Sequence, residues 1–243
     1  MINNTLTPQK DPMGCAIADY FNKSHAHKLL VLSDDFDDDE IPVSQLFRGY
    51  KEMSPLEQKA LQMAEGKILD VGAGSGCHSL ALQEMNKDVT AIDISPLSCE
   101  VMEKRGVKSV INTNLFDKTF VGCYDTILML MNGSGIIGKL ENMEAFFQRM
   151  KELLSPKGKI IMDSSDLKYL FEDEDGSYLI DIAGDYYGEI SYKMKYKNVV
   201  GDEFDWLYVD FQTLSFYASQ FGFKAELIEE GEHYDYLASL SIK

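Results

Sequence analysis

The residues whose types and spacing could do chemistry lie between Ile68 and Asp93. Gly72, Gly74 and Gly76 follow a short apolar run and precede a helical pattern. The backbone at such a junction can approach a ligand closely, and the free N–H groups of the helix point toward it. Asp93 closes the next strand-like run, 17 residues after Gly76. A carboxylate there can accept hydrogen bonds from both hydroxyls of a ribose, so the pattern predicts a nucleotide-like ligand.

The spacing of the glycines narrows the choice of ligand. A dinucleotide-binding turn usually has its third glycine one position later, where this chain has Cys77. A P-loop is excluded because no Gly-Lys-Ser/Thr follows. Asp70 lies two residues before the first glycine. A carboxylate there suits a ligand with an ammonium group and would repel a pyrophosphate; alternatively, Asp70 caps the amides of the turn.

Two segments of the sequence resemble class I S-adenosylmethionine-dependent methyltransferases. LDVGAGSG is similar to the first motif of this family, and VTAIDISP is similar to the second, which ends in the ribose-binding acid. The resemblance covers residues 66–163 well and 212–243 moderately, and it covers the first 50 residues and 166–210 poorly. It implies that S-adenosylmethionine is the cofactor and that its methyl group passes to an acceptor by in-line displacement.

The same resemblance implies which residues contact the cofactor. The methionyl part is expected beside Asp70, Gly72, Ala73, Gly74 and Gly76. The ribose and adenine are expected at Asp93, Ile94, Asn114 and Leu115, although asparagine replaces the commoner aspartate at position 114. The reactive sulfonium is expected beside Met131 and Asn132. Arg48 and Tyr50 are expected to close over the cofactor, with its carboxylate paired to Arg48.

Groups that could handle the acceptor lie on the flanks of this core. A proton must leave a hydroxyl or ammonium acceptor, which can require a general base. The candidate catalytic residues are Asp163, His233 and Tyr234, and the further candidates are Asp166 and Asp235. Aromatic side chains that could wall the pocket are Tyr186 and Tyr187. His78 is interpreted as a packing histidine, and no metal site is expected.

The elements that position these residues alternate between strands and helices. Apolar runs at 68–71, 89–94, 109–112, 124–131 and 159–163 are separated by helical segments and turns. This order is typical of a parallel sheet covered on both faces. Strands at 223–229 and 236–242 complete the predicted α/β fold. It is a doubly wound, mostly parallel, seven-stranded Rossmann-like sheet with a C-terminal antiparallel strand.

Two regions are predicted to surround this sheet. Residues 1–65 are expected to form an N-terminal helical cap before the methyltransferase-like domain at 66–243, with Leu29 and Leu30 on a helical stripe. The acidic run Ser33–Glu40 is expected to be a solvated loop. Residues 166–210 interrupt the alternation of strands and helices, and they predict an inserted β-hairpin lid. A turn is predicted at Ser155–Gly158.

Charge and composition limit the class of partner. The net charge of −17 divides into −5 for residues 1–65, zero for 66–162 and −12 for 163–243. Such a negative surface disfavours nucleic acid and anionic membranes, and the N/D-P-P-Y signature of amino-methylating nucleic-acid enzymes is replaced by Met131-Asn132-Gly133-Ser134. A small-molecule acceptor, cationic or amine-bearing, is the better expectation.

Cellular location and the competing functions follow from the same features. Four dispersed cysteines, no secretory signal and no long apolar run favour a cytoplasmic protein. Two alternatives stay open. One is a non-catalytic protein that binds S-adenosylmethionine or S-adenosylhomocysteine. The other is a nicotinamide-dependent oxidoreductase, which the early third glycine disfavours.

Overall fold

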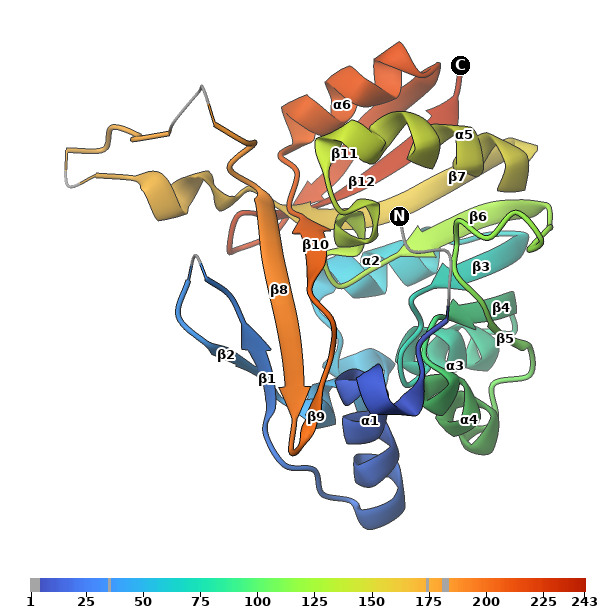
Figure 1. Ribbon diagram of the computed structural model, residues 1–243. Coiled ribbons are helices and arrows are strands. Elements are labelled where there is room, and N and C mark those ends of the chain that lie inside the picture. Colours follow the sequence, from blue (N-terminus) through green and yellow to red (C-terminus); the bar gives the residue numbers. More distant parts are fainter. Residues whose placement is uncertain (1–4, 35, 174, 181–183) are drawn as a thin grey trace.

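A seven-stranded sheet forms the centre of the molecule (Figure 1). The structure is a computed structural model that describes residues 5–34, 36–173, 175–180 and 184–243. The strand order is β11-β12-β7-β6-β3-β4-β5. The strands are β3 (Lys67–Val71), β4 (Asp88–Asp93), β5 (Val110–Asn112), β6 (Tyr124–Met129), β7 (Leu154–Ser165), β11 (Phe223–Glu230) and β12 (Asp235–Ile242). Only β12 pairs antiparallel with both neighbours. The predicted doubly wound, mostly parallel sheet is therefore confirmed.

Helices cover both faces of this sheet, as the alternation of elements predicts. They are α2 (Pro55–Met63), α3 (Cys77–Glu84), α4 (Pro96–Arg105), α5 (Met143–Leu153) and α6 (Phe211–Gln220). Apolar residues of α5 and α6, including Phe146, Phe147 and Leu214, pack in one core cluster. Residues of α2 and α3, including Leu61 and Leu82, pack in a second cluster with other sheet residues. Burial of these side chains supplies the main free energy of folding.

A second sheet joins the N-terminal segment to the insertion. Its order is β10-β8-β1-β2, and β9 also pairs with β8. The strands are β1 (Leu29–Leu32), β2 (Asp39–Ile41), β8 (Glu189–Tyr196), β9 (Val199–Val200) and β10 (Phe204–Leu207). The predicted hairpin within residues 166–210 is present, because β10 pairs antiparallel with β8. In Figure 1 this sheet lies beside the carboxyl ends of β3, β6 and β7.

The prediction for the N-terminal segment is only partly correct. Helix α1 (Pro12–Lys23) is present, and so are three short 3-10 helices: η1 (Pro8–Lys10), η2 (Val43–Phe47) and η3 (Tyr50–Glu52). The helical stripe through Leu29 and Leu30 is wrong, because these residues form β1 and pair with β8. An apolar Leu-Leu-Val-Leu run suits either element, and the partner strand decides between them.

Two predicted connections also differ from the structure. In the acidic run, Asp39 and Glu40 belong to β2 and pair with β1, while Asp35 lies outside the described residues. The predicted turn at 155–158 lies within β7, where the register against β6 shifts between Tyr124 and Thr126. The extra residues are therefore accommodated as a bulge, which keeps the strand continuous.

A loop after β6 connects the two sheets. It contains η4 (Gly133–Ile137) and η5 (Leu140–Asn142). Ser134 Oγ lies 2.7 Å from Ser164 Oγ and donates to the carbonyl oxygen of Leu207 at 2.8 Å. Gly135 packs so closely on the indole of Trp206 in β10 that a Cβ there would overlap the ring. The second sheet is thus fixed to the loop after β6.

Gly135→Ala is expected to lower the free energy of unfolding by about 2 kcal/mol, because the new methyl group must displace Trp206. Trp206 is the only tryptophan of the chain, so its fluorescence emission should shift to longer wavelength as the ring becomes more exposed. Urea unfolding followed by this emission measures both effects. Gly49→Ala is the control, because its φ is −85° and its Cβ would meet nothing closer than 3.8 Å. Equal stability of the two variants would contradict the prediction.

Candidate active site

The glycine turn between β3 and α3 is shaped to leave its backbone accessible. Gly72, Gly74 and Gly76 have φ values of 68°, 56° and 83°, which favour glycine. The amides of Gly72 and Ala73 donate to the carbonyl oxygen of Ile92 at 2.9 and 3.1 Å, which holds the turn against the end of β4. A Cβ on Gly74 would meet nothing closer than 4.0 Å. The turn therefore has room beside it for a ligand.

Asp93 contacts this turn directly. Its Oδ2 accepts from the amide of Gly74 at 2.8 Å and its Oδ1 from the amide of Ser95 at 2.8 Å. Burial raises the pKa of Asp93 to about 6, although the two amides oppose the shift. Asp70 is also buried and accepts from Ser79 Oγ at 2.6 Å. The carboxylate that binds an amide of the turn is thus Asp93, not Asp70 as the sequence alternative supposed.

The residues expected around the adenine lie along one edge, at the ends of β4 and β5. Ile94 is 38% exposed beside the turn, and its carbonyl oxygen accepts from the amide of Leu6 at 2.8 Å. The N-terminal segment therefore passes this edge. Asn114 Oδ1 accepts from the amide of Phe116 at 2.9 Å, and Leu115 is buried in the core.

The turn after β6 contains two consecutive residues in the left-handed conformation. Met131 and Asn132 have φ values of 66° and 55°, a strained arrangement for residues with side chains. Asp163 in β7 accepts from the amides of Met131 at 3.1 Å and Gly133 at 3.0 Å. Ser165 Oγ donates to Asn132 Oδ1 at 2.7 Å. The end of β7 therefore holds the strained turn, and burial raises the pKa of Asp163 to about 6 despite these amides.

Tyrosines and aspartates surround the adjoining edge, where β7 ends. Tyr186 donates to Asp210 at 2.7 Å, and Tyr187 donates to Asp166 at 2.8 Å. The centroids of the two tyrosine rings are 4.5 Å apart. Burial is the largest cause that raises the pKa of both tyrosines. The structure thus brings together the two tyrosines and one of the aspartates that the sequence singled out, and it adds Asp210.

The predicted residues of the last hairpin have different surroundings. Tyr234 is 57% exposed and stacks on Tyr169, with ring centroids 4.6 Å apart. Its carbonyl oxygen accepts from the amide of Asp166 at 2.9 Å, so Tyr234 lies beside the edge where β7 ends. His233 is exposed, and its amide donates to Asp235 Oδ1 at 3.1 Å. Tyr234 therefore adjoins the edge at which β7 ends, whereas His233 lies in an exposed position of the same hairpin.

Arg48 and Tyr50, which were expected to close over the cofactor, point to different partners. Arg48 forms a buried ion pair with Glu57, whereas the Tyr50 hydroxyl accepts from Gln62 Nε2 of α2 at 2.8 Å. His78, which was interpreted as a packing residue, also contacts Glu57. Glu57 was not among the residues predicted for the site. It forms a capping box with Ser54 at the start of α2, and no local signal distinguishes a capping glutamate that also binds an arginine.

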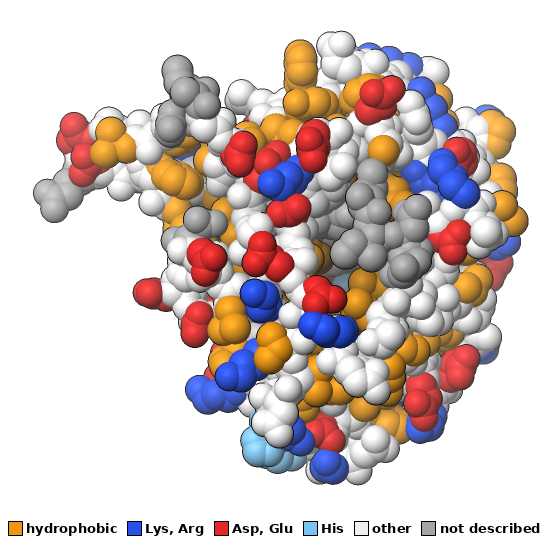
Figure 2. Space-filling model, in the orientation of Figure 1, with side chains coloured by type: hydrophobic (Ala, Val, Ile, Leu, Met, Phe, Trp, Pro, Cys, Tyr) orange, Lys and Arg blue, Asp and Glu red, His pale blue; other side chains and the backbone are white. Residues whose placement is uncertain are grey.

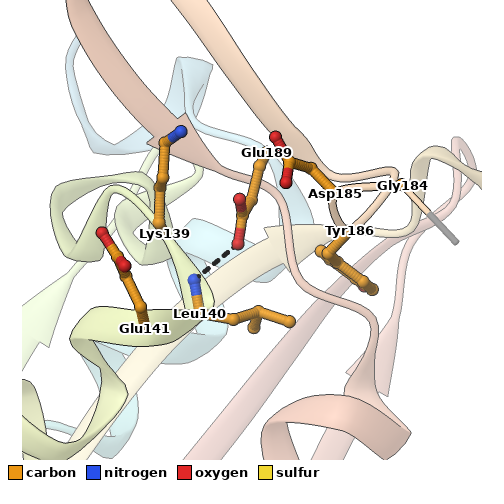
Figure 3. Close-up of a pocket in the computed structure, with 7 residues that line it drawn as sticks. All are labelled: Lys139, Leu140, Glu141, Gly184, Asp185, Tyr186 and Glu189. Carbon is orange, nitrogen blue, oxygen red and sulfur yellow. Dashed lines mark hydrogen bonds between the residues drawn. The ribbon is translucent and has the colours of Figure 1, made fainter.

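A surface pocket lies at the outer end of the loop after β6 (Figure 3). Its volume is about 360 Å³, and Figure 3 shows Glu189 accepting from the amide of Leu140 at 2.8 Å. The lining residues are Lys139, Leu140, Glu141, Gly184, Asp185, Tyr186 and Glu189. Figure 2 shows acidic side chains over the upper parts of β8 and β10, around this region. Within the described ranges, no group of three His, Cys, Asp or Glu side chains could hold a metal ion.

The chain is similar to known methyltransferases in sequence and in fold. A family profile described as a methyltransferase domain matches residues 68–158. The crystal structure of an S-adenosylmethionine-dependent methyltransferase from Bacteroides fragilis, in complex with S-adenosyl-L-homocysteine, is 64% identical to this chain. That match covers 99% of this chain and 98% of the other, with a TM-score of 0.94.

Two more distant proteins are also similar. The cypemycin N-terminal methyltransferase of a Streptomyces species is 28% identical over 102 residues, which are 41% of this chain and 42% of that protein. The chain thus matches less than half the length of this curated relative. The CcbJ methyltransferase from Streptomyces caelestis has the same fold, with a TM-score of 0.63 at 13% identity, covering 97% of this chain and 99% of that chain.

The doubly wound sheet is the Rossmann-like fold of the class I methyltransferases. Because the Bacteroides fragilis relative is 64% identical over almost the whole chain, this protein belongs to the S-adenosylmethionine-dependent methyltransferases. S-adenosylmethionine is its methyl donor. Among the described residues, no helix is both long and apolar enough to span a membrane.

Proposed function

We propose that this methyltransferase acts on a small molecule that carries an amine or another cationic group. The observation that carries this proposal is the negative charge at the carboxyl end of β7, where we place the acceptor. Asp163, Asp166 and Asp210 lie at or beside the carboxyl end of β7, and among the described residues none of them forms an ion pair. A site with unpaired carboxylates favours a cation over an anion.

The glycine turn fits the proposed position of the cofactor. The room beside Gly74 accommodates a ligand close to the backbone, and among the described residues the half-buried carboxylate of Asp93 accepts hydrogen bonds from two backbone amides. Two ribose hydroxyls can donate to this carboxylate, while the ammonium group of the methionyl part is attracted to the buried Asp70. When bound, the cofactor supplies an activated methyl group on its sulfonium.

The chain then has three tasks: to orient the acceptor, to exclude water and to accept a proton. Alignment of the acceptor nitrogen with the methyl carbon, at about 3 Å, supplies much of the rate. We assign this alignment to the turn at Met131 and Asn132, which the end of β7 holds in place. Tyr186, Tyr187 and Tyr234 form the apolar and hydroxyl-bearing wall of the acceptor site.

Proton transfer makes the acceptor reactive. An amine that is bound as a cation first loses a proton to a base, which frees the lone pair of its nitrogen. This lone pair then forms the bond to the methyl carbon while the carbon–sulfur bond breaks and its electron pair stays on sulfur. Asp163 is our candidate, because burial raises its pKa to about 6, a value suited to general-base catalysis near neutral pH. Each of its oxygens accepts one amide hydrogen bond and keeps a lone pair for the proton. His233 remains a weaker candidate because of its exposed position.

Two further observations support an amine. The pocket beside Tyr186 is lined by Glu141, Asp185 and Glu189 and by a single lysine. The curated relative from Streptomyces is named an N-terminal methyltransferase, and a peptide N-terminus is an amine.

The proposal is tested with a panel of small amines, each paired with the alcohol of the same carbon skeleton. Formation of S-adenosylhomocysteine from S-adenosylmethionine is measured for each compound. We expect turnover with members of the amine series and at least tenfold slower turnover with the matched alcohols. Preferential turnover of alcohols or carboxylates would overturn the amine assignment. Tight product binding with no turnover of any compound would instead favour the non-catalytic binding protein.

A further inference from the structure

A buried ion pair beside the glycine turn contains Arg48 and Glu57. Arg48 Nη2 contacts Glu57 Oε1, and Arg48 Nη1 donates to the carbonyl oxygen of Gln45. The same Glu57 oxygen also lies 2.7 Å from His78 Nε2, while its Oε2 accepts from the amide of Ser54 at 2.9 Å. The side chains of Arg48 and Glu57 are 11% and 9% exposed. Burial of such a pair costs desolvation free energy, and the pair is therefore weak evidence for a purely stabilising role.

The protonation of Glu57 decides the direction of these hydrogen bonds. Burial alone would raise its pKa, but hydrogen bonds from His78 and Arg48 outweigh burial and lower the pKa of Glu57 to about 2. The carboxylate is therefore ionised at neutral pH, and His78 Nε2 must carry the hydrogen that it donates. Glu57 thus holds Arg48 while His78 holds Glu57.

The segment before Arg48 docks on the glycine turn. Ser75, inside the turn, donates from its Oγ to the carbonyl oxygen of Leu46. Arg105 donates to Ser75 Oγ at 2.6 Å and lies over the ring of Phe47, 4.6 Å from its centroid. Two consecutive residues before Arg48 are therefore anchored at the turn, so the backbone of Arg48 is fixed there as well.

The contacts of Glu57 place the guanidinium group beside the start of α3. The Glu57 oxygen that Arg48 contacts also lies 2.7 Å from Nε2 of His78, the second residue of that helix. Burial alone would lower the pKa of Arg48, but Glu57 raises it, and Cys77 of α3 and Asp163 near the end of β7 add to this rise. Arg48 therefore lies near the carboxyl ends of the central strands, on the side where the methionyl part of the cofactor is proposed.

Arg48 retains hydrogen-bonding capacity in this position. A guanidinium group has five N–H donors, and two of them meet Gln45 and Glu57. Within the part of the chain that the structure describes, no hydrogen-bond partner is present for the other three. A carboxylate can be bound by two parallel N–H groups of one arginine.

We propose that Glu57, supported by His78, is a positioning residue that holds the Arg48 guanidinium group over the glycine turn to bind the α-carboxylate of the cofactor. This inference rests on the cofactor site proposed above. An arginine held by two partners before binding loses less side-chain freedom when the carboxylate arrives, so the affinity for the carboxylate rises. Glu57 itself does not contact the cofactor.

The experiment compares two ligands that differ by one group. They are S-adenosylhomocysteine and S-adenosyl-3-thiopropylamine, which is the same molecule without the carboxylate. Isothermal titration gives the ratio of their dissociation constants, here called the carboxylate preference. Arg48→Gln is expected to reduce this preference by about 10- to 100-fold, since charge-assisted hydrogen bonds are lost.

Glu57 is tested with a substitution that keeps its charge. Glu57→Asp withdraws the carboxylate by about one methylene group, so the carboxylate preference should fall roughly fivefold when Arg48 is present. In the Arg48→Gln background the same substitution should leave the preference unchanged, because Glu57 acts only through Arg48. His78→Gln leaves the capping contact of Glu57 with Ser54 intact and should change the preference in the same direction.

The matched control is Glu52→Asp. Glu52 Oε2 accepts from the amide of Gly49 at 2.8 Å in the same segment, whereas the hydrogen bonds and the ion pair of Arg48 go to Gln45 and Glu57. An unchanged preference in both Glu57→Asp and His78→Gln, or an equal change in both Arg48 backgrounds, would overturn the positioning role. A preference unaffected by Arg48→Gln would overturn the carboxylate site. Failure of both ligands to bind the unsubstituted protein would refute the cofactor site itself.

Discussion

Asp93→Ala is expected to weaken the binding of S-adenosylhomocysteine by about 100-fold or more. The substitution removes the acceptor of two ribose hydroxyls, and each hydrogen bond to a charged group contributes about 1.5–3 kcal/mol. It also removes the acceptor of the amides of Gly74 and Ser95, so the turn loses one of its supports. Isothermal titration calorimetry measures the affinity, and circular dichroism verifies that the variant is folded.

The control for this prediction lies on the same strand. Asp88 is exposed at the start of β4, five residues from Asp93, and Asp88→Ala should bind S-adenosylhomocysteine as the unsubstituted protein does. Asp93→Asn removes the negative charge but nearly keeps the shape of the side chain, and its amide group keeps one oxygen acceptor for a ribose hydroxyl. We expect an intermediate loss for this variant. An affinity of Asp93→Ala within threefold of that of the control would show that Asp93 does not bind the ribose.

Local patterns in the sequence were sufficient to predict the central sheet. Its strands are short apolar runs bounded by glycine, proline or charged residues, and capping residues such as Ser54 and Ser95 mark the helix starts. The contact between Asp93 and the turn was also predictable. Parallel neighbouring strands end at the same edge, so residues that follow β3 and residues that close β4 must meet there.

The second sheet could not be predicted in the same way. Leu29 pairs with Tyr196, which is far away in the sequence. A run of four apolar residues does not specify its partner, and no alternation of polar and apolar residues identifies β1 as a strand. Strands from residues 1–65 and from residues 166–210 therefore form one sheet, and this pairing appears only when both segments are placed in space.

The partners of the polar side chains at the site could not be predicted from the sequence either. The chemical types of Asp163 and Arg48 indicated a role, but their partners are set by tertiary structure. Asp163 binds the amides of a turn about 30 residues earlier, and Arg48 binds a glutamate whose position in the sequence indicates a helix cap. Residue type therefore identifies candidate groups, whereas the tertiary structure determines their partners.

The stability of the ligand-free protein should increase when the pH is lowered from 7 to 5. The pKa values of Asp93 and Asp163 are both raised from 3.8 to about 6 in the folded protein, mainly by burial. Between pH 4 and 6 the folded state therefore holds protons that the unfolded chain has released, and the free energy of unfolding falls as the pH rises. We expect it to be about 2–3 kcal/mol higher at pH 5 than at pH 7.

Other carboxylates limit this gain at lower pH. The pKa of Glu57 is lowered from 4.5 to about 2, so its contribution to stability is present above pH 4.5 and is lost as the pH falls toward 2. The maximum of stability is therefore expected near pH 5. Urea unfolding at a series of pH values measures the curve, and Asp93→Asn and Asp163→Asn should each flatten its slope between pH 5 and 7. Asp88→Asn should leave the slope unchanged.

Cofactor binding should show the opposite dependence on pH. The ribose hydroxyls need the ionised carboxylate of Asp93 as acceptor, so protonation below its pKa of about 6 should weaken S-adenosylhomocysteine binding roughly tenfold at pH 5. The buried charge that lowers the stability of the empty site at neutral pH is thus the charge that binds the ligand. A stability curve that rises from pH 5 to 7, or an affinity that does not fall at pH 5, would show that Asp93 is already ionised at pH 5.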